Sequence, residues 1–128
     1  MEILNLLTGI QHVGILTKDI KRTIEFYERL GFNVALATQN GQQSVAFMQL
    51  KNLVMEFYEG DASNIQNGAI DHFAIDVKDI DKVFAFVKSL GVELLNQEVQ
   101  ALPFWKKGVR FFTIVGPNNE KIEFCERL

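Results

Sequence analysis

Residues 10–34 read IQHVGILTKDIKRTIEFYERLGFNV, and residues 70–94 read IDHFAIDVKDIDKVFAFVKSLGVEL. The two segments align without a gap at an offset of 60 residues, and nine of the 25 aligned positions are identical. The identical positions are Ile10/Ile70, His12/His72, Ile15/Ile75, Lys18/Lys78, Asp19/Asp79, Ile20/Ile80, Phe26/Phe86, Leu30/Leu90 and Gly31/Gly91. Similarity at a fixed offset predicts that one supersecondary unit is used twice.

A second pair of similar segments follows the first pair. Residues 55–59 read MEFYE and residues 122–126 read IEFCE, now at an offset of 67. The seven extra residues must therefore lie between the two matched blocks of the second copy. Residues 96–108 are the obvious place, because Pro103 and Gly108 interrupt regular structure there.

The local patterns predict the elements of each copy. Asp19 and Asp79 suit helix N-caps, and Gly31 and Gly91 suit the left-handed residue that ends a helix. The apolar helix faces are Ile20, Ile24, Tyr27 and Leu30 in the first copy, and Ile80, Phe84, Val87 and Leu90 in the second. Strands are expected at 10–16, 32–38, 43–50, 52–59, 70–77, 92–97, 109–115 and 120–126, with a hairpin turn at Asn40-Gly41 and a hinge at 60–68. The fold class is therefore α+β, with two repeated βαβββ modules, about 10–59 and 70–126, in one domain spanning 1–128.

Four side chains in this repeat suit a metal site. The chain has two histidines, His12 and His72, and both occupy the same place in the first strand of a module. Glu56 and Glu123 share the equivalent place in the last strand. If the modules pair about a pseudo-twofold axis, two imidazoles and two carboxylates converge, a set that suits Ni²⁺, Zn²⁺, Co²⁺, Mn²⁺ or Fe²⁺. The alternative is a pair of structural histidines and two solvated strand-end glutamates.

The same residues carry a resemblance to a known family. The segments that carry it are His12-Val13-Gly14, Asp19, residues 26–32, residues 108–112 and residues 122–124. Together they resemble the vicinal oxygen chelate superfamily, and within it glyoxalase I, over about residues 10–127. The resemblance implies a half-barrel metal-binding pocket and the ligand set His12, Glu56, His72 and Glu123. It also implies one divalent ion, Ni, Zn or Co, and a homodimer.

The activity that the resemblance implies is a lyase reaction on a small-molecule substrate. Glyoxalase I isomerises the hemithioacetal of a thiol and an aldehyde, as lactoylglutathione lyase does. Glu123 is then the catalytic base, Glu56 is its catalytic counterpart on the other side of the metal, and the histidines only bind the ion. A carboxylate at Glu56 favours this reaction over the epimerases, which usually have Gln there. Extradiol dioxygenases and fosfomycin-resistance transferases use a His, His, Glu set, and bleomycin-binding members lack metal ligands.

Two positions depart from bacterial glyoxalase I. Leu16 stands where that family usually has an Arg that helps to hold glutathione, and Gly60 stands where it usually has an Asn. The turn Gly116-Pro117-Asn118-Asn119 also differs from the family's Asp-Pro turn, but Asn suits such a turn as Asp does. The identity of the thiol therefore stays open. Another enzyme of the superfamily, an epimerase or a dioxygenase, and a non-catalytic small-molecule binding or resistance protein are the alternatives.

Other residues near the expected pocket allow two interpretations each. By strand alternation, Tyr58 and Cys125 share a face with Glu56 and Glu123. Cys125 is either a reactive thiol or a small buried strand residue. The loop with Phe104, Trp105, Lys106 and Lys107 forms either an apolar lid with a basic rim, or a packed loop with solvated lysines. Arg110 is expected to be a surface charge.

Composition narrows the class of protein. The 128 residues are 48% hydrophobic and 23% charged, which is typical of one globular domain. A net charge of −3 offers no electrostatic footprint for nucleic acid or an anionic membrane. One cysteine fits a reducing compartment, and the N-terminal MEILNLLTGI lacks the basic region of a signal peptide. No apolar run approaches the roughly 20 residues of a membrane span, so a cytoplasmic protein is expected.

Overall fold

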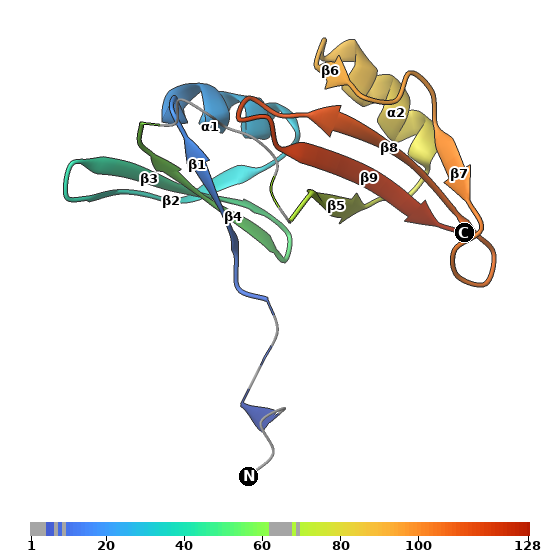
Figure 1. The fold of residues 1–128 in the computed structure, drawn as a ribbon, viewed down its shortest axis with the longest axis horizontal. Helices are drawn as coiled ribbons and strands as arrows, with labels where there is room; N and C mark the ends of the chain where they lie inside the picture. Colours follow the sequence, from blue (N-terminus) through green and yellow to red (C-terminus); the bar gives the residue numbers. More distant parts are fainter. Residues whose placement is uncertain (1–4, 7, 9, 62–67, 69) are drawn as a thin grey trace. The chain divides into compact units, whose positions relative to one another are not determined.

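The computed structural model describes residues 5–6, 8, 10–61, 68 and 70–128. The chain divides into two compact units, Met1–Asp61 and Ala62–Leu128. Each unit contains one copy of the repeat, so each is described by itself (Figure 1). Residues 62–67 of the expected hinge lie outside the described part of the chain.

The first unit is one four-stranded sheet with a helix on one face. Its elements are β1 Val13–Thr17, α1 Ile20–Arg29, β2 Asn33–Asn40, β3 Gln43–Leu50 and β4 Leu53–Glu59. The strand order is β1-β4-β3-β2; β1 runs parallel to β4, and the other neighbours are antiparallel. Helix α1 is the crossover after β1 and contacts β2, β3 and β4.

The second unit repeats this plan with an added strand. Its elements are β5 His72–Asp76, α2 Ile80–Ser89, β6 Glu93–Leu94, β7 Gln100–Leu102, β8 Val109–Val115 and β9 Lys121–Arg127. The order is β5-β9-β8-β6, with β7 also pairing with β8. Again the first strand is parallel to the last, and α2 contacts β8 and β9. The α+β fold with two βαβββ modules is confirmed; their union in a single domain stays a prediction.

The core of each unit lies between its helix and one sheet face. In the first unit Met48, Met55 and Phe57 are fully buried beneath Tyr27 of α1, whose ring lies 4.7 Å from that of Phe57. In the second unit the ring of Phe112 stacks on Phe124 at 4.9 Å. Because side chains alternate along a strand, the residues between these core positions point to the opposite face of the sheet. Glu56 and Glu123 are among them.

One expected strand is much shorter than predicted. Residues 92–97 were expected to form a strand, but only Glu93–Leu94 pair with β8 as β6. The physical reason is that the Asn96 side chain accepts a hydrogen bond from the backbone N–H of Thr113 at 2.8 Å, so a side chain replaces the next rung of the ladder. The extra residues of this module form β7 and the turn before β8, as the change of offset predicted.

Both helices begin as the repeat predicts. Asp19 accepts from the backbone N–H of Arg22, and Asp79 accepts from that of Lys82. A second carboxylate joins each of these helix starts. Glu59 accepts from the backbone N–H of Ile20 at 2.9 Å, and Glu126 accepts from that of Ile80 at 3.0 Å. The last glutamates of MEFYE and IEFCE are therefore helix caps that tie the last strand to the helix.

Replacing Glu126 with Ala is expected to lower the free energy of unfolding by about 1–2 kcal/mol, because backbone N–H groups at the start of α2 lose their acceptor. Chemical denaturation followed by circular dichroism measures this change. Glu98→Ala, at an exposed position of the same unit, is the matched control and should change stability little. Equal stability of the Glu126 and Glu98 variants would contradict the capping role.

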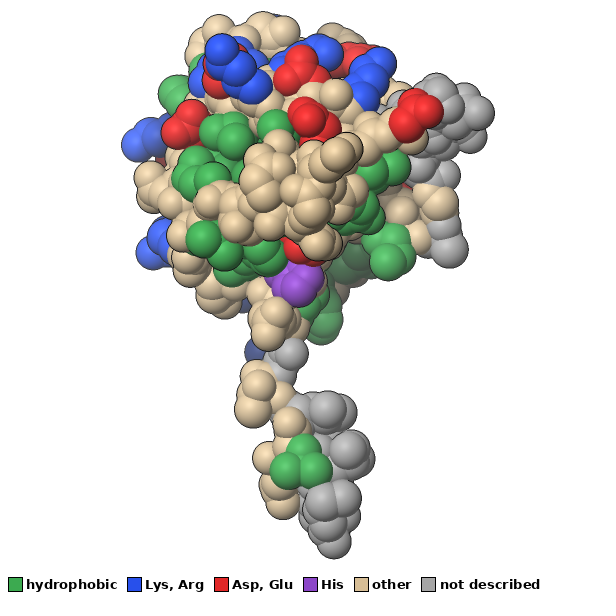
Figure 2. All heavy atoms as spheres, turned by 90° about the vertical axis from the view of Figure 1, so that its left-hand side faces the viewer, with side chains coloured by type: hydrophobic (Ala, Val, Ile, Leu, Met, Phe, Trp, Pro, Cys, Tyr) green, Lys and Arg blue, Asp and Glu red, His purple; other side chains and the backbone are tan. Residues whose placement is uncertain are grey.

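The free edge of the first sheet is uncharged. All eight residues of β2 are exposed, and residues 30–50 contain no Asp, Glu, Lys or Arg. Figure 2 faces the side of the molecule where β2 and β3 project, and shows mainly uncharged side chains over its centre. Edge strands without charge are open to pairing with another strand.

Among the described residues, neither helix has the length and apolar character needed to cross a membrane.

Candidate functional site

The first unit brings His12 and Glu56 together. Glu56 lies in the middle of β4, opposite Gly14 of β1, and His12 lies one residue before β1 rather than within it. Nε2 of His12 is 3.4 Å from Oε1 of Glu56. The other ring nitrogen, Nδ1, is 3.0 Å from the side-chain oxygen of Gln11. The His12 ring contacts the ring of Phe47 of β3 edge-on, with 5.6 Å between their centres, so an aromatic ring lies beside this His–Glu pair.

The second unit repeats this arrangement with His72 and Glu123. His72 begins β5, and Glu123 lies in β9 opposite Ala74. Nε2 of His72 is 3.9 Å from Oε2 of Glu123, while Nδ1 is 2.9 Å from Oδ2 of Asp71. Lys121 donates to the other oxygen of Asp71 at 2.8 Å. These contacts with Lys121 and then His72 hold the pKa of the Asp71 carboxyl below its usual range.

Each module therefore presents one His–Glu pair with the same ring nitrogen, Nε2, turned toward the carboxylate. Within either unit, the described residues form no group of three or more His, Cys, Asp or Glu side chains placed to hold a metal ion. Two donors per unit are thus the geometry that the repeat predicts, and a complete set of four needs both units. Convergence of the four remains a prediction.

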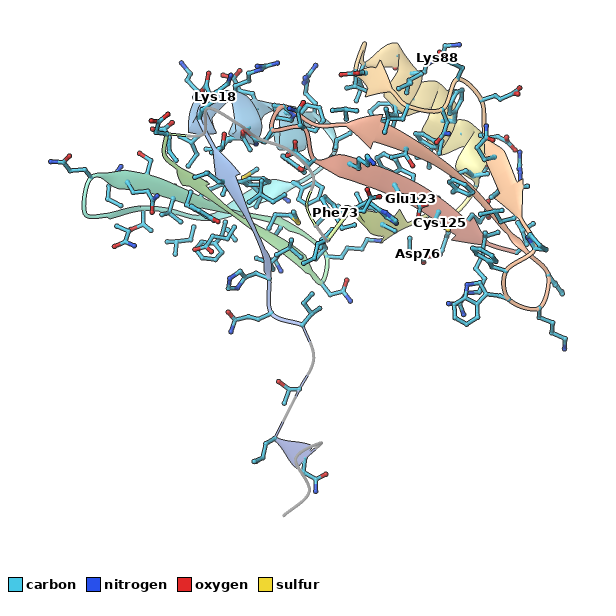
Figure 3. All side chains as sticks on the ribbon, in the orientation of Figure 1. Lys18, Phe73, Asp76, Lys88, Glu123 and Cys125 are labelled. Atoms are coloured by element: carbon cyan, nitrogen blue, oxygen red, sulfur yellow. The ribbon has the colours of Figure 1, made fainter. Side chains whose placement is uncertain are left out.

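Sequence reasoning missed Asp71 and Lys121. The signal for Asp71 was present, because Asp71 directly precedes His72 just as Gln11 directly precedes His12. Asp76 was missed as well. It follows His72 by four residues in β5, so alternation places both on one face, and it lies opposite Cys125 of β9. Figure 3 shows Asp76 and Cys125 side by side near Glu123 on this part of the sheet.

Leu16 and Gly60, the two departures from bacterial glyoxalase I, lie against each other. A Cβ at Gly60 would be 3.1 Å from Cδ1 of Leu16, which is tighter than nine in ten real Cβ contacts. Leu16 is also the strand partner of Tyr58, which shares the face of Glu56 as predicted. At this end of the first module's sheet, Leu16 and Gly60 therefore lie together with the amide of Gln43 nearby, where the glutathione-binding pattern has an Arg and an Asn.

Cys125 is a partly buried strand residue rather than an activated thiol. Burial raises the pKa of the Cys125 thiol, and the nearby carboxylates of Glu123 and Asp76 raise it further. Since the thiolate is the nucleophile, these surroundings lower its reactivity at neutral pH.

We expect iodoacetamide to alkylate Cys125 of the folded, metal-free protein several-fold more slowly at neutral pH than it alkylates a free cysteine. The rate should rise only at more alkaline pH, because the raised pKa shifts the appearance of thiolate upward. Mass spectrometry of timed samples measures the rate. Asp76→Asn should speed the reaction because it removes one of the two repelling charges. A neutral-pH rate at or above that of free cysteine would contradict this account.

The loop after β7 and the start of β8 bear on the remaining candidates. Trp105 and Phe104 are exposed, and the guanidinium of Arg127 lies 3.9 Å from the centre of the Trp105 ring. This cation–π contact links the loop to the end of β9. Arg110 makes two hydrogen bonds of 2.9 Å to Asp81 of α2, so it is a structural ion pair on the helix side of the sheet.

Comparison with known proteins agrees with this architecture. A sequence model of the Glyoxalase/Bleomycin resistance protein/Dioxygenase superfamily matches residues 9–124. The uncharacterized protein YwbC of Bacillus subtilis is 30% identical over 125 residues, which cover 92% of this chain and 97% of YwbC. The fosfomycin resistance protein FosX of Listeria monocytogenes is 27% identical over 96 residues, or 70% of each chain.

Solved structures share the fold. The crystal structure of a glyoxalase family protein from Enterococcus faecalis superposes with a TM-score of 0.78 at 23% identity, covering 94% of this chain and 99% of that one. A FosX structure with Mn(II) and 1S,2S-dihydroxypropylphosphonic acid superposes with a TM-score of 0.77 at 19% identity, covering 95% and 94%. With a family match across residues 9–124 and the two βαβββ modules, this chain belongs to the Glyoxalase/Bleomycin resistance protein/Dioxygenase superfamily.

Proposed function

We propose that this protein is a divalent-metal-dependent enzyme of the glyoxalase I kind, which isomerises the hemithioacetal of a small thiol and an α-ketoaldehyde. The observation that carries the proposal is the repeated pair. In each module a histidine Nε2 faces a glutamate oxygen, at 3.4 Å in the first and 3.9 Å in the second. A family member with a carboxylate at both strand positions has the donor set of that reaction.

The geometry of each pair fits a shared metal ion. Imidazole nitrogens and carboxylate oxygens lie about 2.0–2.2 Å from such an ion, so two of them on one ion are roughly 2.9–3.4 Å apart. The distance in the first pair matches this range, and the second needs a small closure. Both Nδ1 atoms are engaged elsewhere, so Nε2 is the free donor in each ring. His12, Glu56, His72 and Glu123 would hold Ni²⁺, Zn²⁺ or Co²⁺, ions that suit a mixed imidazole and carboxylate donor set.

The chain's own residues then divide the work. A bound metal ion supplies Lewis-acid stabilisation of the negative charge that develops on the substrate oxygens. Glu123 removes the proton from the carbon that carries the thiol sulfur and returns it to the neighbouring carbonyl carbon. The hydroxyl proton of the first carbon passes to the oxygen of the second, so the hemithioacetal becomes the thioester of a 2-hydroxy acid with no change in composition. The side chain of Glu123 is 19% exposed, against 28% for Glu56, so Glu123 is the better desolvated of the two candidate bases. His12 and His72 only bind the ion.

The thiol of this reaction is proposed to be one other than glutathione. Neither Leu16 nor Gly60 offers a positive charge to a glutathione carboxylate. Tyr58 beside Leu16 adds an aromatic face. A less charged thiol therefore fits this end of the sheet better.

A second candidate is chemistry of the FosX kind on a small phosphonate antibiotic. The observation in its favour is 27% identity to FosX over 96 residues, together with the Mn(II) in a FosX structure. By the resemblance noted above, fosfomycin-resistance enzymes use a His, His, Glu set. Such a function would therefore tolerate loss of the ligand in Glu56→Ala, whereas the glyoxalase I reaction would lose one of its four metal ligands.

A homodimer belongs to this proposal, because the family resemblance implies one. The exposed, uncharged edge of β2 supports it by offering unpaired backbone groups to a neighbouring strand. Light scattering with and without added Ni²⁺ tests it. A mass that doubles only when metal is present would indicate half-sites shared between two chains.

The deciding experiment is metal analysis of protein purified without chelator or added metal, followed by two assays on the same sample. The proposal expects about one divalent ion per four-donor site, and thioester formation from methylglyoxal with at least one thiol other than glutathione, which serves as the comparison thiol in the panel. Fosfomycin consumption in the presence of Mn²⁺ tests the second candidate. A protein with no metal and no affinity for Ni²⁺, Zn²⁺ or Mn²⁺ would overturn both.

A further inference from the structure

Each module contributes one half-site, His12 with Glu56 or His72 with Glu123. The two half-sites are alike in geometry but differ in the charge of the group that contacts Nδ1 of the histidine. Nδ1 of His72 lies 2.9 Å from a carboxylate oxygen of Asp71, and Nδ1 of His12 lies 3.0 Å from the amide oxygen of Gln11. Both oxygens are acceptors, so each Nδ1 carries the proton and donates it. In the neutral imidazole Nε2 is then the unprotonated nitrogen, and in each ring it faces a glutamate oxygen.

Asp71 is itself fixed in place. Lys121 donates to its second oxygen at 2.8 Å, and Lys121 is the strand partner of His72 in the pairing of β5 with β9. The carboxylate is therefore held from two sides, by the ring that it orients and by a cation on the neighbouring strand. Among the ion pairs and hydrogen bonds of the described residues, none places a cation against the side chain of Gln11.

We propose that Asp71, held by Lys121, is a positioning residue that fixes the orientation and tautomer of His72. It strengthens Nε2 as an electron-pair donor to the metal ion. The second module is therefore the tighter half of the metal site. This inference rests on the proposed function, because it assumes that His72 is a ligand. A carboxylate behind a ligating imidazole fixes its ring and raises its donor strength, and loss of such a partner typically costs about 10–100-fold in metal affinity. An amide such as that of Gln11 orients the ring but adds no charge.

The test measures Ni²⁺ affinity by isothermal titration calorimetry in four variants. Asp71→Ala should weaken binding about 10–100-fold. Asp71→Asn, which copies the neutral amide of the first module, should weaken it less. Gln11→Ala should have a smaller effect than Asp71→Ala, because no charge is lost. Asp81→Asn removes another exposed carboxylate of the same unit, one that pairs with Arg110 on the helix side, and it should leave affinity unchanged.

A second readout reports on the ring without metal. ¹⁵N NMR of the histidine side chains in metal-free protein should show His72 as the Nδ1–H tautomer in the wild type and a mixture of tautomers in Asp71→Ala. His12 should be unchanged in that variant. A purely structural role for Asp71 would alter stability without this signature.

The outcomes separate the inference from the proposed function. A wild-type protein that does not bind Ni²⁺ overturns the proposed function. A wild-type protein that binds Ni²⁺, together with an Asp71→Ala variant of equal affinity and an unchanged His72 tautomer, overturns only the role of Asp71. Because the Asp71 side chain is 54% exposed, these variants are expected to fold.

Discussion

Replacing His72 with Ala is expected to weaken Ni²⁺ or Co²⁺ binding by more than roughly 100-fold, which is beyond the loss expected for an outer partner such as Asp71. The physical reason is that each unit offers one imidazole. The chain contains no third histidine that could replace the lost donor, and Glu123 alone would be left in the second half-site. Calorimetry on the metal-free variant, and metal content after purification, measure the loss.

Two comparisons make this result specific. His12→Ala should also cause a large loss, and the double variant should bind no metal at either half-site. The fold should survive, because the side chain of His72 is 44% exposed and takes no part in the core; circular dichroism and thermal unfolding check this. A His72→Ala variant that binds Ni²⁺ as tightly as the wild type would show that the second histidine is not a ligand.

The pairing of each histidine with its glutamate could be predicted from sequence because strand geometry leaves little freedom. The first and last strands of a module are parallel neighbours, so equivalent residues of two modules fall on equivalent rungs. Side-chain alternation then fixes the face. The helix boundaries were equally predictable, because Asp19, Asp79, Gly31 and Gly91 carry specific capping chemistry.

Side-chain orientation was not predictable in the same way. The repeat indicates where His72 begins its strand but not which ring nitrogen faces Glu123, because this depends on the neighbour that holds the other nitrogen. Identical residues at equivalent positions of the repeat also differ in burial: Phe26 is buried, whereas its repeat partner Phe86 is exposed. The length of β6 was predicted wrongly because a single hydrogen bond, from the backbone N–H of Thr113 to the side chain of Asn96, replaces backbone pairing there.

Replacing Glu123 with Gln is expected to lower the rate of α-proton exchange in a hemithioacetal substrate by about 10²–10⁴-fold, which is the usual contribution of a positioned general base. An amide oxygen can still face Nε2 of His72 and can still act as a metal ligand, so metal affinity should fall far less than the rate. The carboxamide cannot accept the proton at neutral pH. NMR of product formed in D₂O, with methylglyoxal and the most active thiol, measures the exchange directly.

Glu56→Gln is the matched control, because it makes the same change at the repeat-equivalent position of the first module. If Glu123 is the base, the Glu123 variant should lose much more of the rate, while both variants should lose similar amounts of metal affinity. Equal losses of rate would mean that the two carboxylates share the proton transfer. A Glu123→Gln, Glu56→Gln double variant that keeps wild-type turnover would rule out carboxylate base catalysis at this site. If the wild-type protein has no turnover and the double variant still binds its small-molecule ligand, the protein is instead a binding member of its superfamily.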